Sequence, residues 1–203
     1  MRFQRALWSL ALVAGFAVPT FAEVENYAID TGHSQVGFKV RHLVSKVPGR
    51  FDKFTGTIAV DPADLTTAKI TAAIEAASIS TNHADRDNHL RSADFLDAAK
   101  FPELKFESVR YIPEGAKGGR LLGNLTIRGI TKAVELKVEV LGFGADPWGG
   151  QRGGFSASTT INRKDFGMVW NKALDAGGVV LGDDVEIQID LETVRQKPAA
   201  AKG

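Results

Sequence analysis

Apolar and polar residues alternate one by one along most of this chain, a period that excludes most helical folds. Residues 134–140 show it clearly, with four aliphatic side chains separated by Glu135, Lys137 and Glu139. Residues 185–191 repeat the pattern. Successive side chains of a strand point to opposite faces, so the alternation predicts strands with one buried and one solvated face. The chain is therefore predicted to be all-β and antiparallel.

About nine segments carry this strand character, and fusion or bending of some of them predicts a count near eight. They are residues 27–30, 36–42, 56–60, 68–81, 105–112, 121–128, 134–140, 155–161 and 185–192. Strands with one apolar face each must pack as two sheets or close on themselves, and closure removes exposed edges. The long 68–81 segment favours an antiparallel eight-stranded barrel. A two-sheet sandwich stays open on strand spacing alone.

One stretch breaks the alternation. Residues 82–100 are rich in Ala, Asp, Leu and His and predict one or two short helices. Asn82 and Ser92 stand where helix N-caps are expected, and a Phe-Pro pair ends the segment. Residues 128–131, Arg-Gly-Ile-Thr, lie between two strong strands and predict a tight antiparallel hairpin.

The N-terminus has the features of a cleaved secretory signal. Arg2 and Arg5 precede an uncharged run over residues 6–18. Small residues then mark the predicted cleavage site, which follows Ala22. We expect a signal peptide over 1–22, a barrel domain over 23–195 and a flexible tail over 196–203. The alternative is an uncleaved anchor, although the apolar run is shorter than the roughly 20 residues that span a bilayer. Removal of 22 residues leaves 181 of 203, with 23 Lys and Arg against 24 Asp and Glu.

Composition excludes several function classes. The near-neutral charge lacks the positive excess of a nucleic-acid binder. The absence of Cys removes thiol nucleophiles, disulfides and thiolate metal sites together. There is no Gly-x-Ser-x-Gly elbow and no phosphate-binding loop. No catalytic constellation is predicted.

A cluster of ionisable residues in the helical segment could suggest a metal site. His83 pairs with Asp87, and Asp85 with His89, at a spacing of four residues. On one helix the two pairs point about 200° apart, so they cannot serve a single ion. We expect no metal and no cofactor here, only a capped, hydrogen-bonded polar segment.

The candidate strands are short of bulk on both faces. One face of 68–78 reads Ala, Ile, Ala, Ile, Ala, Ser, and Gly37, Gly56, Gly123 and Gly142 lie within or beside strands. Each glycine alone indicates a bend in the sheet. Together the small side chains favour a cavity inside the barrel, and clustered Phe residues could line it for a lipid chain.

Several strings in order resemble one family. They include Phe-Lys-Val-Arg-His at 38–42, Arg-Asp-Asn-His-Leu-Arg-Ser at 86–92, Gly-Asn-Leu-Thr-Ile-Arg-Gly at 123–129 and Arg-Lys-Asp-Phe-Gly-Met at 163–168. Over residues 26–194 the chain resembles the YceI-like family of secreted polyisoprenoid-binding proteins. The family's Asp-Phe-Phe stretch is here Asp94-Phe95-Leu96, which keeps an apolar side chain.

The resemblance implies a lipocalin-like eight-stranded barrel with the helical segment closing one end. It implies a periplasmic carrier for a long amphiphilic isoprenoid, for example a prenylated quinone. It also implies a homodimer and, in some members, a membrane b-type cytochrome partner. His42 and Arg163 are candidates to contact the lipid headgroup. The alternative for each of them is a purely structural role. The residues expected to contact the ligand are Val36, Phe38, Val40, His42, Phe51, Phe54, Ile70, Ile74, Leu90, Phe95, Phe106, Leu136, Val138, Phe155, Arg163 and Phe166.

Two other functions stay open from the sequence. One is an isomerase or hydrolase acting on a similar apolar substrate through His33, His42 or Asp87, which would show a pH-dependent rate. The other is a solid barrel that serves as a partner module for a membrane protein. The lipid carrier is favoured over both.

Overall fold

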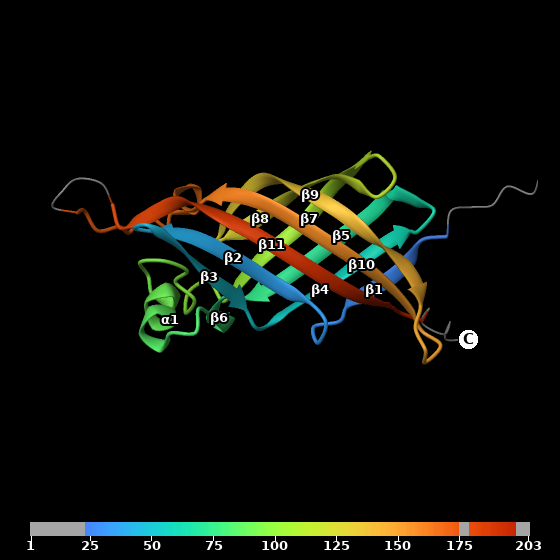
Figure 1. Cartoon of the computed structure of the whole chain (residues 1–203), viewed down its shortest axis with the longest axis horizontal. Helices are drawn as coiled ribbons and strands as arrows, with labels where there is room; N and C mark the ends of the chain where they lie inside the picture. Colours follow the sequence, from blue (N-terminus) through green and yellow to red (C-terminus); the bar gives the residue numbers. More distant parts are fainter. Residues whose placement is uncertain (1–22, 175–178, 198–203) are drawn as a thin grey trace, which may run out of the picture.

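Eight antiparallel strands close on themselves in the computed structural model, which describes residues 23–174 and 179–197 (Figure 1). The order around the barrel is β1, β4, β5, β7, β8, β9, β10 and β11, and β11 pairs back onto β1. This closure confirms the barrel and excludes the sandwich. The closing strands are β1 (Glu25–Ile29), β4 (Phe54–Asp61), β5 (Asp64–Glu75), β7 (Glu103–Glu114), β8 (Gly118–Ile127), β9 (Ile130–Ala145), β10 (Gln151–Asn162) and β11 (Leu181–Arg195).

Three further strands branch from β11 at one end of the barrel. β11 pairs with β1 only through its last residues, and its longer first part pairs with β2 (Gln35–His42). β3 (Ser45–Phe51) pairs with β2 along its whole length but touches β6 (Ile79–Ser80) only at Arg50 and Phe51. The rest of β3 is an open sheet edge. Pro48, which has no N–H, and Lys46 make this edge a poor template for another strand.

The inward face of each strand follows from the alternation in the sequence. Along β9, Leu136, Val138 and Val140 are buried, whereas Lys137 and Glu139 between them are exposed. Ala68, Ile70, Ala72 and Ile74 of β5 likewise share the inner face. The inner and outer faces predicted from the period of two are confirmed on both strands.

Residues 68–81 do not form the single long strand expected from the sequence. β5 ends at Glu75, and a 3-10 turn, η1 (Ala76–Ser78), redirects the chain into β6. Ala76 is fully buried and its N–H donates to the Pro102 carbonyl at 2.9 Å. Because this turn leaves the barrel wall, β6 pairs with β3 and not with β7. Alternation alone continues through the break and does not reveal it.

The hairpin predicted at residues 128–131 is confirmed between β8 and β9. Arg128 and Gly129 form its two-residue turn, with φ of 53° and 72°. The Arg128 guanidinium also donates to the Ala93 carbonyl at 2.9 Å and to the Phe95 carbonyl. The turn therefore anchors the segment that follows the helix.

The helical segment contains one α-helix, α1 (Ala84–Arg91). Neither predicted N-cap is correct. His83 caps the helix, since its Nδ1 accepts from the Arg86 N–H at 3.4 Å, while Asn82 takes a left-handed φ of 60°. Ser92 is the C-cap and its hydroxyl donates to the His89 carbonyl at 2.7 Å.

Parts of both ends of the chain lie outside the described residues. The expected signal peptide, 1–22, and positions 198–203 of the expected tail lie outside them. β11 ends at Arg195, and the Gln196 N–H donates to the Asn26 carbonyl at 2.7 Å. Within residues 23–174 and 179–197, no helix has the length and apolar character needed to cross a bilayer.

Candidate functional site

A cavity of about 310 Å³ runs along the inside of the barrel. Its lining takes side chains from all eight closing strands and from β2, β3 and α1. Val185 and Leu191 lie at opposite ends of an unbroken stretch of the inner face of β11, and six residue steps of strand cover about 20 Å. The cavity is therefore elongated along the barrel axis.

The lining is almost entirely aliphatic and aromatic. Phe106, Phe155 and Ile70 are only half-buried although they point inward. A core side chain touches neighbours on all sides, so the remaining surface of these residues faces the cavity. The polar residues of the lining are His42, Thr55, Thr81, Arg86, Tyr111, Thr159 and Arg163.

Two glycines keep the lumen wide. A Cβ on Gly49 would stand 2.3 Å from Phe38 Cζ, and a Cβ on Gly123 would stand 2.4 Å from Phe106 Cζ. Each ring therefore lies against the barrel wall over a glycine of the neighbouring strand. Gly123 also pairs with Ser108 beside the irregularity of β7, so the packing role adds to the bend expected there.

One end of the cavity is closed by aromatic side chains. Tyr27 lies 5.5 Å from Phe143, and Phe143 lies 5.6 Å from Phe155, measured between ring centroids. Tyr27 is almost fully buried and its hydroxyl donates to Glu25 Oε2 at 2.5 Å. Burial raises the pKa of Tyr27 and the Glu25 carboxylate raises it further, so the phenol stays neutral.

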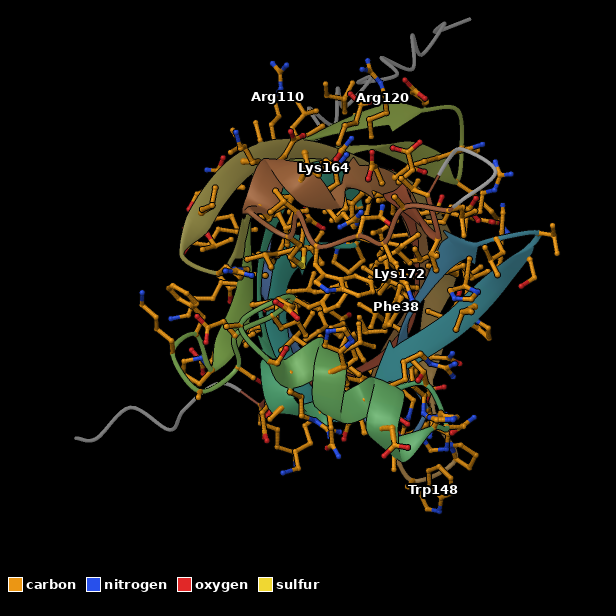
Figure 2. The ribbon with its side chains drawn as sticks, turned by 90° about the vertical axis from the view of Figure 1, so that its left-hand side faces the viewer. Phe38, Arg110, Arg120, Trp148, Lys164 and Lys172 are labelled. Atoms are coloured by element: carbon orange, nitrogen blue, oxygen red, sulfur yellow. The ribbon has the colours of Figure 1, made fainter. Side chains whose placement is uncertain are left out.

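The other end is covered by α1 (Figure 2). His89 of α1 meets Trp170 edge to face at 4.9 Å and Phe95 at 5.0 Å. The buried Asp87 carboxylate accepts from the Thr81 N–H at 2.8 Å and from the Thr81 hydroxyl at 2.5 Å. These contacts hold the helix across the barrel end, and they confirm that the helical segment closes it.

Arg163 supports this end from the opposite wall. It is 2% exposed and opens η2 (Arg163–Phe166). Its guanidinium donates to the carbonyls of Gly182, Met168 and Trp170 at 2.9, 2.5 and 2.8 Å. It also pairs with Asp183 at 2.9 Å. With its N–H groups used in this way, Arg163 borders the cavity but serves the structure.

Fifteen of the residues predicted to contact a ligand lie on the cavity lining; contact with a ligand itself stays a prediction. Phe166 is the exception. It is 1% exposed and packs with Ile127, Ile161 and Met168 beneath the cavity end. Its place on a 3-10 turn, outside any strand, gives it no inward phase that alternation could predict.

Sequence reasoning missed Tyr111, which lines the cavity from β7. Phe106 points inward, so unbroken alternation would turn Tyr111 outward five residues later. A bulge between Ser108 and Arg110 reverses the phase. The Tyr111 hydroxyl is buried without a hydrogen-bond partner among the described residues, and burial raises its pKa.

Arg86 and Thr81 were also missed, because the helical segment carries no alternation. The exposed Arg86 reaches the cavity at the edge of α1. Its Nε donates to Thr81 Oγ1 at 2.7 Å and its Nη2 to the Thr81 carbonyl at 2.9 Å. A cation therefore lies at the edge of the cavity lining beside Thr81.

The residues proposed for an enzymatic alternative are not assembled into one site. Of His33, His42 and Asp87, only His42 lines the cavity. Asp87 is buried against Thr81, and His33 lies on the turn between β1 and β2. The expected pairing of His83 with Asp87 is likewise absent among the described contacts, since His83 caps α1.

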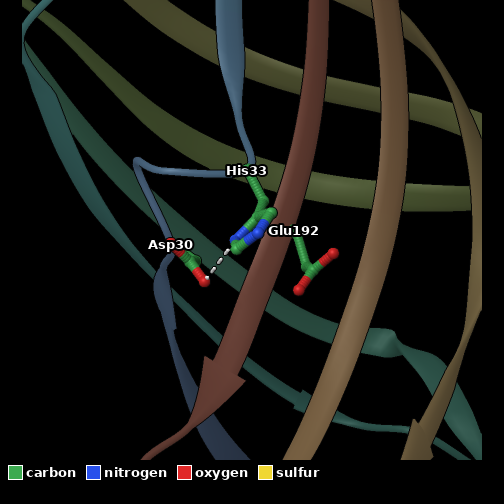
Figure 3. A group of neighbouring side chains, drawn as sticks. All are labelled: Asp30, His33 and Glu192. Atoms are coloured by element: carbon green, nitrogen blue, oxygen red, sulfur yellow. Dashed lines mark hydrogen bonds and ion pairs between the residues drawn. The ribbon is translucent and has the colours of Figure 1, made fainter. Parts of the chain in front are cut away.

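A different ionisable cluster joins Asp30, His33 and Glu192, whose ligand atoms lie within 4.8 Å of one another (Figure 3). Asp30 Oδ2 lies 3.0 Å from His33 Nδ1 and 2.8 Å from Arg152 Nη1. Arg152 also pairs with Glu192 and, at 3.1 Å, with Asp146. Because one guanidinium bridges these carboxylates, the cluster is an ion-pair network that ties the end of β1 to β10 and β11.

This network makes stability depend on pH. Hydrogen bonds from Arg152 and His33 lower the pKa of Asp30 from 3.8 to about 2. A depressed pKa stabilises the fold above the unfolded-state pKa and loses that effect as pH falls through the folded-state value. We expect Asp30→Asn to remove part of the fall in stability between pH 4 and pH 2, measured by urea unfolding. Asp184→Asn is the control, and an unchanged profile for Asp30→Asn contradicts the assignment.

The fold and cavity can now be compared with known proteins. The sequence model of the YceI-like domain matches residues 27–193, nearly all of the barrel. The chain belongs to the YceI-like family. The resemblance carried by the sequence strings, which span both α1 and η2, is thus confirmed.

Known proteins align with most of the length of this YceI-like protein. A UPF0312 protein of Vibrio cholerae is 39% identical over 168 residues, which cover 81% of this chain and 89% of the relative. The solved YCEI protein of Campylobacter jejuni is 32% identical, with a TM-score of 0.68 over 83% of this chain and 97% of that one. A solved polyisoprenoid binding domain from Saccharophagus degradans is 15% identical, with a TM-score of 0.63, over 86% of this chain and 100% of that one. That last likeness is one of fold.

Proposed function

We propose that this YceI-like protein binds a long polyisoprenoid lipid in the barrel and carries it through the periplasm. The observation that carries the proposal is the elongated cavity, whose lining is apolar over about 20 Å of β11. The polyisoprenoid binding domain from Saccharophagus degradans has the same fold, which supports this class of ligand. The signal peptide predicted over 1–22 supports the location.

Apolar burial alone accounts for useful affinity. Each buried CH₂ group contributes about 0.8 kcal/mol, so a chain of about twenty carbons gains roughly 16 kcal/mol before costs. Ordering the chain and losing its translational freedom take back several kcal/mol or more. No ionic anchor is needed, and selectivity for a headgroup falls to the few polar side chains of the lining.

The headgroup is proposed to lie at the end covered by α1. The hydrogen-bonded pair Thr81 and Arg86 and, separately, His42 are the polar lining residues toward that end, whereas the aromatic side chains at the opposite end suit a hydrocarbon terminus. Arg163 is withdrawn as a headgroup contact because its N–H groups serve Met168, Trp170 and other protein partners. Thr81 donates to Asp87, but Arg86 has N–H groups beyond the two that it donates to Thr81, and a neutral, acceptor-rich headgroup such as a quinone matches these and His42. The homodimer and the membrane cytochrome partner stay predictions.

Native mass spectrometry of the purified protein, followed by organic extraction, tests the proposal. We expect a co-purified isoprenoid, and saturable one-to-one binding when a long-chain prenylated quinone is added from detergent micelles. Squalene, an isoprenoid hydrocarbon without a headgroup, reports the contribution of the chain alone. Recovery of no lipid together with no binding of either probe contradicts the proposed function.

A further inference from the structure

The turn between β2 and β3 has an unusual composition. His42 pairs with Ser45, so Leu43 and Val44 form a two-residue hairpin turn. Leu43 has a left-handed φ of 52°, a conformation that favours Gly or Asn and disfavours a bulky side chain. Val44 is fully exposed to solvent. Two aliphatic residues thus stand where turn chemistry favours small or polar ones.

Neighbouring residues extend this apolar surface. The Leu43 N–H donates to the Val180 carbonyl at 2.9 Å, and Leu181 pairs with His42. Val179, which is 53% exposed, lies beside this contact and bridges to Ala173. We call the exposed side chains of Leu43, Val44 and Val179 the aliphatic tip. It projects at the end of the molecule where β2 and β3 meet the start of β11 (Figure 1).

The aliphatic tip is continuous with the cavity. His42 and Leu181, the residues next to it on both strands, belong to the cavity lining. Other exposed large apolar residues, such as Val109 on β7 and Trp148 after β9, lie elsewhere on the barrel. The tip is therefore an exposed apolar surface that borders the lumen.

Cations flank the aliphatic tip. The exposed Arg41 places its Nε 3.1 Å from the Leu43 carbonyl, and Lys172 is exposed on the adjoining segment. Lys46 is already paired with Glu186. Aliphatic side chains flanked by Arg and Lys match a phospholipid surface. The aliphatic side chains enter the acyl boundary, and the cations contact the phosphate groups.

We infer that the aliphatic tip docks on a lipid bilayer, so that the cavity exchanges its ligand directly with the membrane. This inference rests on the proposed function, because it explains how a water-insoluble isoprenoid reaches the lumen. The chain takes the lipid from the bilayer without passing it through water. The docking is weak and reversible because the apolar surface is small.

The test separates docking from ligand binding. Leu43→Asn with Val44→Thr replaces two of the three aliphatic side chains of the tip and keeps the turn, since Asn favours the left-handed conformation and Thr has the shape of Val. We measure cosedimentation with phosphatidylcholine vesicles that contain some phosphatidylglycerol and a prenylated quinone, and the rate of quinone transfer from them. Val109→Thr, an exposed change remote from the tip, is the matched control.

We expect the double variant to lose vesicle association and to transfer quinone at least about tenfold more slowly. Its melting temperature should be equal or higher, and it should bind quinone from micelles as the wild type does. Transfer that the double variant leaves unchanged, or that Val109→Thr slows equally, overturns the inference. A wild-type protein that binds no quinone from micelles contradicts the proposed function instead.

Discussion

Phenylalanine in place of Ala157 is expected to weaken lipid binding about a hundredfold while the barrel stays folded. Ala157 lies on the inner face of β10 and belongs to the cavity lining. An aromatic ring there would occupy part of a lumen of about 310 Å³. If it displaces about four carbons of the ligand, the loss is about 3 kcal/mol, or about a hundredfold in affinity.

Thr160→Phe is the matched control for the Ala157→Phe variant. Thr160 lies on the same strand but is exposed on its outer face. It adds a ring without entering the lumen, so lipid titration by native mass spectrometry should match the wild type. Circular dichroism confirms that both variants fold. If Ala157→Phe binds lipid as tightly as Thr160→Phe, the ligand does not occupy this part of the barrel.

Arg163→Ala is expected to destabilise the protein by about 2–4 kcal/mol in urea unfolding. The substitution removes the donors for Gly182, Met168 and Trp170 carbonyls and a partner of Asp183. A buried carbonyl without a partner carries the full cost of leaving water, which is why the expected loss is large. The residue holds η2 to the start of β11 and the segment that reaches α1.

Two variants sharpen this prediction. Arg163→Lys keeps the charge but cannot reproduce the forked donors, so an intermediate loss is expected. Lys164→Ala removes the exposed partner that shares Asp183, at 2.7 Å, and should cost less than about 1 kcal/mol. Equal losses for Arg163→Ala and Lys164→Ala would contradict the structural role of Arg163.

Alternation predicted most of the lining but failed wherever the chain leaves a regular strand. Val36, Phe38 and Val40 are read correctly because β2 pairs without a bulge across them. Tyr111 was missed because the β7 bulge shifts the phase. Arg86 was missed because a helical residue near a barrel end has no strand parity. Local pattern and tertiary position coincide only while the period of two is unbroken.

The helix caps show a similar limit. Asn82 has good N-cap chemistry, but the Asp87 carboxylate accepts from Thr81, the residue before Asn82. This contact holds the chain so that the helix begins one residue later than the pattern suggests. The cap then falls to His83. The buried contact between Thr81 and Asp87 thus overrides the local preference of Asn82 for the N-cap position.

The sequence by itself determined which side chains face inward where a strand runs without a bulge, since successive residues point to opposite faces. It also determined that these inward faces are apolar and short of bulk, as along Ala68–Ala72 of β5. Tertiary structure decided that the strands close through β11 and β1, and that the ring of Phe38 lies over Gly49. It also decided that the Arg163 guanidinium donates to protein carbonyls. These features join residues far apart in the chain, and only closure of the barrel brings them within contact distance.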